Sequence, residues 1–188
     1  MSSDIESARD RLRAFVVERS DDLKCRLGIG YRASRYAPTS FDDLRREFRM
    51  CRRTGLPIRV SSLHNERTIL GRETNLAFRF WHDCTHLELN AGFDHDGEVV
   101  VGQEQLRQLE EEDDIEVQSL AWRMLFAETI GQTKCATHLG VFPTDQWRFT
   151  LEYLRLGLRE AIWREGRRRS VLPLWSARGT VQGPREVA

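Results

Sequence analysis

Hydrophobic residues recur at intervals of three and four along most of the chain, which is the pattern of amphipathic α-helices. Capping and breaking residues divide this pattern into predicted helices over about residues 3–19, 41–53, 75–90, 97–111, 115–138 and 145–165. Residues 20–39 are expected to form a short helical turn followed by a loop. Residues 58–70 hold β-type side chains around Asn65 and Glu66, which predicts a short hairpin or an extended arm.

These elements predict an all-α protein. Four successive helices joined by short loops, within residues 75–165, are expected to form the core of an antiparallel helical bundle. The two N-terminal helices are expected to pack outside that core, together with the hairpin or arm. The length of 188 residues favours one domain, expected to span residues 1–166. Residues 167–188 lack periodicity and are expected to be a loosely ordered C-terminal tail.

The helix predicted over residues 75–90 is apolar around most of its circumference, which is typical of a buried helix. One narrow stripe is polar, and it consists of Asn75, Arg79, His82, Asp83, His86 and Asn90. Stripes that face solvent usually carry Lys, Glu, Arg and Gln rather than His and Asn. We therefore interpret the stripe as one wall of an internal polar site, with a solvent-facing strip as the alternative.

His82 and His86 lie one helical turn apart, so their imidazoles can bind the same metal ion. Glu128 is predicted as the third ligand, because it lies among apolar residues of the helix expected over 115–138. A buried carboxylate is costly unless a cation, an arginine or a proton neutralises it, and an ion pair with Arg79 is the alternative. Two histidines and one carboxylate are typical of catalytic zinc sites and of non-haem iron sites, so the expected cofactor is a divalent metal, Zn or Fe.

Other polar residues have candidate roles around this ligand set. Glu98 and His138 lie near helix ends and are possible further ligands, and if both joined the site would approach a dinuclear carboxylate centre. Asp83 could orient a metal-bound water, accept its proton or bind the metal directly. Gln132 and Asn90 are expected to contact the ligands or the substrate.

The segment from His82 to His86, His-Asp-Cys-Thr-His, resembles the H-E-x-x-H helix of zinc peptidases. Glu128 is similar in placement to the third ligand of the glutamate-type members of that group. The resemblance implies a zinc ion and places Asp83 at the position of the general base, where those enzymes carry glutamate rather than aspartate.

The pair His82-Asp83 also resembles the paired ligands of HD phosphohydrolases. Such an enzyme needs another histidine upstream and an aspartate on a late helix. The only upstream histidine, His64, lies outside the predicted helices, and Asp145 lies at a helix start. This second resemblance therefore covers less of the expected ligand set than the first.

Charge and cysteine content restrict the remaining possibilities. Formal net charge is zero, so no overall field attracts a membrane, and nucleic acid is an unlikely partner that is not excluded. Residues 61–120 are nevertheless acidic, with four Lys/Arg against 14 Asp/Glu, which suits cation binding. There is no apolar run of membrane-spanning length. The four cysteines are widely spaced, which favours a reduced, cytoplasmic protein.

The leading hypothesis is a metal-dependent hydrolase that activates a metal-bound water, with His82, His86 and Glu128 as ligands. The first alternative is a non-haem iron oxygenase or oxidase that uses the same ligands. The second is a non-catalytic helical interaction module, whose basic second helix and Arg167–Arg169 would contact an acidic partner. The substrate, a small molecule or a peptide, and the oligomeric state are left open.

Overall fold

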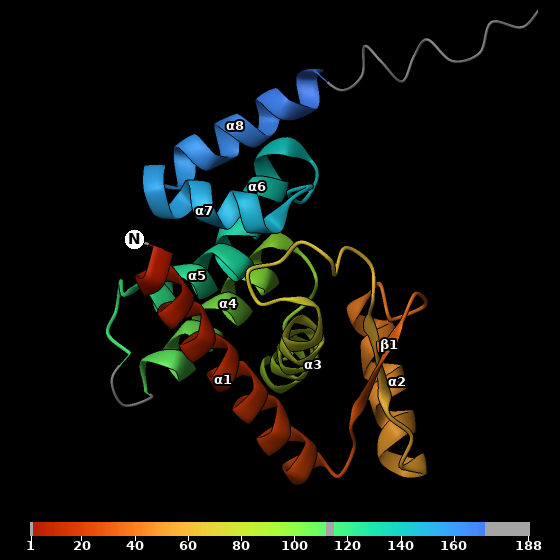
Figure 1. Ribbon diagram of the computed structural model, residues 1–188. Helices are drawn as coiled ribbons and strands as arrows, with labels where there is room; N and C mark the ends of the chain where they lie inside the picture. The colour runs from red at the N-terminus through yellow and green to blue at the C-terminus, as the bar shows by residue number, and fades with distance from the viewer. Residues whose placement is uncertain (1, 112–114, 172–188) are drawn as a thin grey trace, which may run out of the picture.

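The computed structural model describes residues 2–111 and 115–171 (Figure 1). These residues are mostly helical, as the all-α prediction requires. The elements in chain order are α1 (Ser2–Leu27), β1 (Tyr31–Ser34), α2 (Phe41–Thr54), β2 (Ile58–Ser61), α3 (Arg72–Leu89), α4 (His95–Glu110), α5 (Leu120–Phe126), the π-helical turn η1 (Ala127–Gly131), α6 (Gln132–Leu139), α7 (Gln146–Leu156) and α8 (Leu158–Val171). Among the described residues, no helix is both long enough and apolar enough to cross a membrane.

A β1–α2–β2 unit replaces the hairpin or arm expected over residues 58–70. The two strands are parallel, with Tyr31 opposite Ile58 and Ser34 opposite Ser61. The hairpin was wrong because the partner strand of residues 58–61 lies in the segment expected to be a loop. Parallel strands need a long crossover, and α2 provides it. Helix α2 begins after Ser40, as its side-chain oxygen accepts a hydrogen bond from the Asp43 N–H at 3.2 Å.

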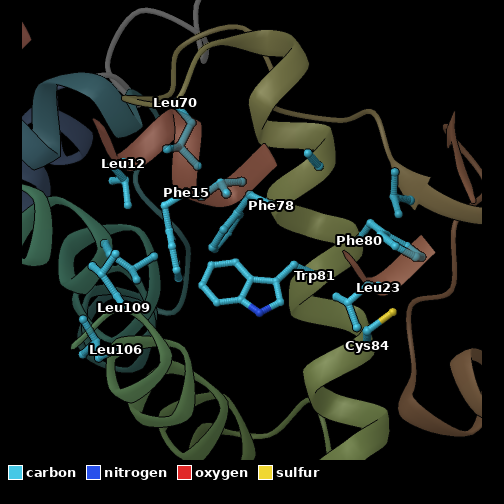
Figure 2. Packing of buried hydrophobic residues seen from close by; sticks show 14 of the residues in the cluster. Leu12, Phe15, Leu23, Leu70, Phe78, Phe80, Trp81, Cys84, Leu106 and Leu109 are labelled. Carbon is cyan, nitrogen blue, oxygen red and sulfur yellow. The ribbon is translucent and has the colours of Figure 1, made fainter. Parts of the chain in front are cut away.

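Helix α3 occupies the centre of the molecule, between α1 on one side and the two strands on the other (Figure 1). Trp81 and Phe78 point toward α1, and Trp81 meets the Phe15 ring edge-on at 5.4 Å (Figure 2). On the opposite side Phe80 contacts the Tyr31 ring of β1 at 5.1 Å. Burial on both sides confirms the prediction from its apolar circumference. The helix begins at Arg72, three residues before the start expected at residue 75.

The four continuous helices expected for the bundle core are not what the structure contains. The helix expected over 115–138 begins only at Leu120, because Gln118 has a positive φ of 67°. It is then interrupted by η1, where the Gln132 N–H bonds to the Ala127 carbonyl five residues back. The helix expected over 145–165 is divided into α7 and α8 at Gly157, whose φ of 85° favours glycine.

The expected C-terminal tail lies only partly within the described residues. Residues 167–171 belong to α8, and residues 172–188 lie outside the described part of the chain. Arg168 donates to the carboxylates of Glu152 on α7 and Glu165 on α8, at 2.9 and 2.7 Å. Glu165 is buried and also accepts the Thr144 backbone N–H at 2.9 Å. The end of α8 is therefore joined to α7 and to the loop before it.

Candidate metal centre

Three ligand-type side chains, from α3 and α4, converge on one point. The Nε2 atoms of His82 and His86 lie 3.1 Å apart. The two carboxylate oxygens of Glu98 lie 3.2 Å from the His82 Nε2 and 3.5 Å from the His86 Nε2. Together they form a group of residues that could hold a metal ion. We call this group the His–His–Glu cluster.

Hydrogen bonds on the far side of each ring orient the two imidazoles. The His82 Nδ1 lies 2.9 Å from the Gln105 side-chain oxygen, and the His86 Nδ1 lies 3.0 Å from the Ala91 carbonyl oxygen. Both partners are acceptors, so each Nδ1 carries the proton and each neutral ring presents a lone pair at Nε2. Two lone pairs 3.1 Å apart repel unless a cation lies between them. A proton or a metal ion can fill that role.

The separations within the cluster are those of atoms that share one metal ion. Zinc–nitrogen bonds are about 2.0–2.1 Å, so two ligands at angles of about 90–110° lie roughly 2.9–3.4 Å apart. The His82–His86 and His82–Glu98 separations of 3.1 and 3.2 Å fall in this interval, and the His86–Glu98 separation of 3.5 Å is just outside it. Little movement is needed to bind an ion.

Close packing by two glycines positions Glu98. Asp94 caps α4 by accepting the Gly97 N–H at 2.8 Å, so the helix begins at His95, three residues before Glu98. A Cβ on Gly97 would lie 2.0 Å from the Gly92 carbonyl oxygen, so only glycine fits there. A Cβ on Gly102 would lie 2.8 Å from Ile130 of η1. These approaches hold α4 close to the end of α3 and to η1.

The electrostatics of the cluster favour charge separation between Glu98 and the imidazoles. Burial by itself would raise the pKa of Glu98, but the imidazoles of His82 and His86 beside it favour the charged carboxylate, outweigh burial and hold that pKa at about 2. Burial opposes a charge on His82 as well, yet Glu98 and Gln105 raise the pKa of that imidazole above its ordinary value. The cluster therefore stabilises one positive charge between its ligand atoms.

The structure places Glu98, and not Glu128, as the carboxylate beside the histidines. Glu128 lies on η1, where its buried carboxylate accepts the Thr150 hydroxyl at 3.0 Å. Burial raises the pKa of Glu128 to about 7, although the hydrogen bond from Thr150 by itself lowers that pKa. The ion pair with Arg79, the alternative to metal binding by Glu128, is not formed within the described residues, since Arg79 donates to the Leu63 carbonyl and acts on Glu128 only through its field.

A cleft of about 740 Å³ connects the cluster with Glu128. Its polar lining residues include Asn75, Arg79, His82, Asp83, Glu98, Glu128 and Gln132. Four members of the polar stripe of α3 therefore line an internal cleft, as the interpretation of the stripe requires. The other two differ, because His86 is fully buried behind the cluster and Asn90 ends the helix with a φ of 51°.

Asp83 and Gln132 line this cleft without belonging to the His–His–Glu cluster. Burial raises the pKa of Asp83 to about 6, and the nearby histidines and Arg79 limit that rise. Gln132 is buried, and its Nε2 has no hydrogen-bond partner among the described residues. His138 is exposed, outside the cluster, and hydrogen-bonded to the Lys134 carbonyl.

Gln105 is the contributor that sequence reasoning missed. It is fully buried on α4, two turns after Glu98, and fixes the orientation of His82. A signal was present, because Glu98, Gly102 and Gln105 share the helix face of the buried Leu109. A glutamine on such a face needs a polar partner.

Comparisons with protein-family models, with curated proteins and with solved structures find no match for this chain.

Proposed function

We propose that His82, His86 and Glu98 bind one divalent metal ion and that the protein is a metal-dependent hydrolase. The observation that carries the proposal is the pair of Nε2 atoms 3.1 Å apart, each on a ring whose Nδ1 is held by an acceptor. Such outer hydrogen bonds are typical of metal-binding histidines, because they fix the tautomer and orient the ring.

The cleft supports a catalytic rather than a purely structural metal. Three protein ligands leave a coordination position open for water or substrate, whereas structural zinc sites have four protein ligands. A divalent metal in such a site lowers the pKa of a bound water toward about 7. Asp83 follows His82 directly and lines the same cleft, so its carboxylate is the proposed proton acceptor. Its pKa of about 6 leaves it ionised at neutral pH.

Metal analysis of protein purified without a histidine tag tests the ligand set. We expect about one metal ion per chain in the wild type and strongly reduced metal in His82→Ala and His86→Ala. His138→Ala is the matched control, because this exposed histidine lies outside the cluster and should leave metal content unchanged. Unchanged metal content in both cluster variants would overturn the proposed site.

The identity of the metal separates the hydrolase from an iron oxygenase or oxidase. Two histidines and one carboxylate with open positions are also the ligands of non-haem Fe²⁺ oxygenases. Retained zinc supports hydrolysis, whereas retained iron, with oxygen consumption that depends on added Fe²⁺, supports the oxygenase alternative. Iron without zinc would contradict the hydrolase.

The structure offers less to the interaction-module alternative. Of its proposed basic surfaces, Arg168 and Arg169 are occupied by ion pairs with Glu165, which is buried. Arg167 and the exposed arginines of α2 remain, the latter being Arg45, Arg46, Arg49, Arg52 and Arg53. Metal-free protein that binds a polyanion with steep salt dependence would favour that alternative over the hydrolase.

A further inference from the structure

Outside the His–His–Glu cluster, the lining of the cleft includes two polar groups with unused hydrogen-bonding capacity. Gln132 is 5 % exposed, and its Nε2 lacks a hydrogen-bond partner in the described part of the chain. Glu128 is 7 % exposed, and no salt bridge neutralises it there. Buried donors and charges are rarely left in this state, so both groups indicate a ligand.

The two groups lie side by side. They flank the transition from η1 to α6, and the Gln132 amide is close enough to stabilise the charged form of Glu128. Residues 128 and 132 are four positions apart, so both side chains lie on the same face of the helix. A ligand at this point meets an N–H donor from Gln132 and a carboxylate acceptor from Glu128.

A neighbouring donor and acceptor are complementary to an amide group. The ligand carbonyl would accept from the Gln132 Nε2, and the ligand N–H would donate to the Glu128 carboxylate. The Thr150 hydroxyl already donates to one Glu128 oxygen, which restricts the direction from which a ligand can approach.

The rest of the cleft is suited to an apolar group attached to that amide. Its lining includes Phe78 on α3, Ala37 and Pro38 after β1, and residues 141–143 between α6 and α7. Phe142 is 55 % exposed at this site, so a large apolar side chain is available to cover a ligand. Small-molecule sites commonly combine such apolar walls with a few fixed polar groups.

Charge in the cleft disfavours a phosphorylated ligand. Asp83, Glu98 and Glu128 contribute three carboxyl groups to its lining, whereas its arginines are Arg79 and Arg169. Arg169 is already paired with Glu165. A neutral amide avoids the repulsion that an anion would meet at Glu128.

We infer that Gln132 and Glu128 form a binding subsite for an amide group carrying an apolar substituent, and that this is the substrate class of the cleft. The inference deepens the proposed function and rests on it for the statement that the ligand is a substrate. Binding at the subsite itself needs no metal, because both polar groups belong to η1 and α6.

The test compares benzamide with methyl benzoate on chelator-treated protein, by chemical-shift titration. Both probes have a ring and a carbonyl, but only benzamide has an N–H for Glu128. Leaving a buried acceptor unpaired weakens binding, so we expect benzamide to bind about tenfold more tightly. Equal affinities, or no binding of benzamide near its solubility limit, would overturn the inference.

Two variants assign the contacts. Gln132→Met should weaken both probes about tenfold, because both use the donor. Glu128→Met should weaken benzamide alone and remove its advantage over the ester. Gln146→Met is the matched control, since Gln146 also lines the cleft, and it should leave both affinities unchanged. Unchanged benzamide affinity in Gln132→Met, with the fold verified by thermal melting, contradicts the subsite.

The result is independent of the metal assignment. A metal-free wild type that binds benzamide in this manner supports the subsite even where metal analysis rejects the His–His–Glu cluster. Conversely, a protein that retains zinc but does not prefer benzamide to methyl benzoate would support the metal site and refute the amide subsite. Inorganic phosphate that displaces benzamide would also count against the inferred ligand class.

Discussion

Glu98 and Glu128 line the same cleft, yet their surroundings shift the pKa values of the two carboxyl groups in opposite directions. Both are removed from water, but two imidazoles lie against Glu98 and can hold a positive charge beside it, whereas Glu128 accepts a hydrogen bond from the neutral Thr150 hydroxyl. The pKa is therefore about 2 for Glu98 and about 7 for Glu128. Burial alone does not decide the charge of a carboxyl group; the neighbouring donors decide it. Glu98 is prepared to bind a cation, and Glu128 to hold or exchange a proton.

The most direct test of this comparison replaces each glutamate by glutamine. Glu98→Gln should lower affinity for Zn²⁺ by about 100-fold or more, since it removes a charged ligand from the cluster. Glu128→Gln makes the same chemical change elsewhere in the cleft and should leave zinc affinity within about twofold. Competition titration against a chromophoric chelator measures both. Equal losses in the two variants would mean that the carboxylates act as one site.

The pH dependence of the free energy of unfolding tests the raised pKa of Glu128. Its pKa is about 7 in the folded chain against an ordinary value of 4.5, so the folded state holds the proton more tightly. The stability it contributes is full below pH 4.5 and is lost as pH rises through about 7. We expect metal-free wild type to lose of the order of 2–3 kcal/mol more than Glu128→Gln between about pH 5 and about pH 8.

Urea unfolding of both proteins at the two pH values measures this difference. Asp83 has a pKa raised to about 6 and contributes in the same direction, but it is present in both proteins and cancels in the comparison. Parallel losses of stability in wild type and variant would show that Glu128 is ionised with an ordinary pKa.

A substitution at Gln105 should have a smaller effect on the zinc affinity of the His–His–Glu cluster. Gln105→Met keeps the length of the side chain but removes the acceptor that orients His82. Zinc affinity should fall about tenfold, as is usual for the outer partners of metal-binding histidines. Gln105→Glu should restore it and shift metal retention to lower pH, because a carboxylate makes the imidazole a better ligand. A similar loss in both variants would indicate only disturbed packing.

The smallest expected effect concerns Thr150. Thr150→Val preserves shape but removes the hydroxyl that stabilises the ionised form of Glu128. The pKa of Glu128 should rise further, so the loss of stability with pH should occur at higher pH by roughly half a unit to one unit. Nuclear magnetic resonance of the labelled Glu128 carboxyl carbon reports this directly. An unchanged titration would show that the Thr150 hydroxyl does not influence the pKa of Glu128.

The polar stripe on α3 could be read from the sequence because helical periodicity alone determines it. His82 and His86 are one turn apart in any helix, and the apolar remainder of α3 requires burial. The caps at Ser40, Asp94 and Asp145 are likewise local features, and each accepts a hydrogen bond from the third residue that follows. These contacts need no information from distant segments.

Local sequence patterns could not predict which of the two glutamates lies beside the histidines. Glu98 lies on α4, which packs against α3, and Glu128 lies on η1, which packs against α4. Neither helix pattern specifies rotation or distance relative to His82. Gly97 and Gly102 decide the matter, because Gly97 lets α4 approach the Gly92 backbone and Gly102 lets it approach the Ile130 side chain. The interruption at η1, which turns Glu128 toward Thr150, also has no periodic signature.

The sequence by itself determined a mostly helical chain, a buried helix with two histidines one turn apart, and acidic residues near it. The tertiary structure alone decided that β1 and β2 pair in parallel, that Glu98 completes the cluster, and that Gln105 orients His82. The division has a physical reason. Periodicity and capping arise from contacts within one turn of backbone, whereas a site assembled from α3 and α4 depends on how closely two surfaces pack.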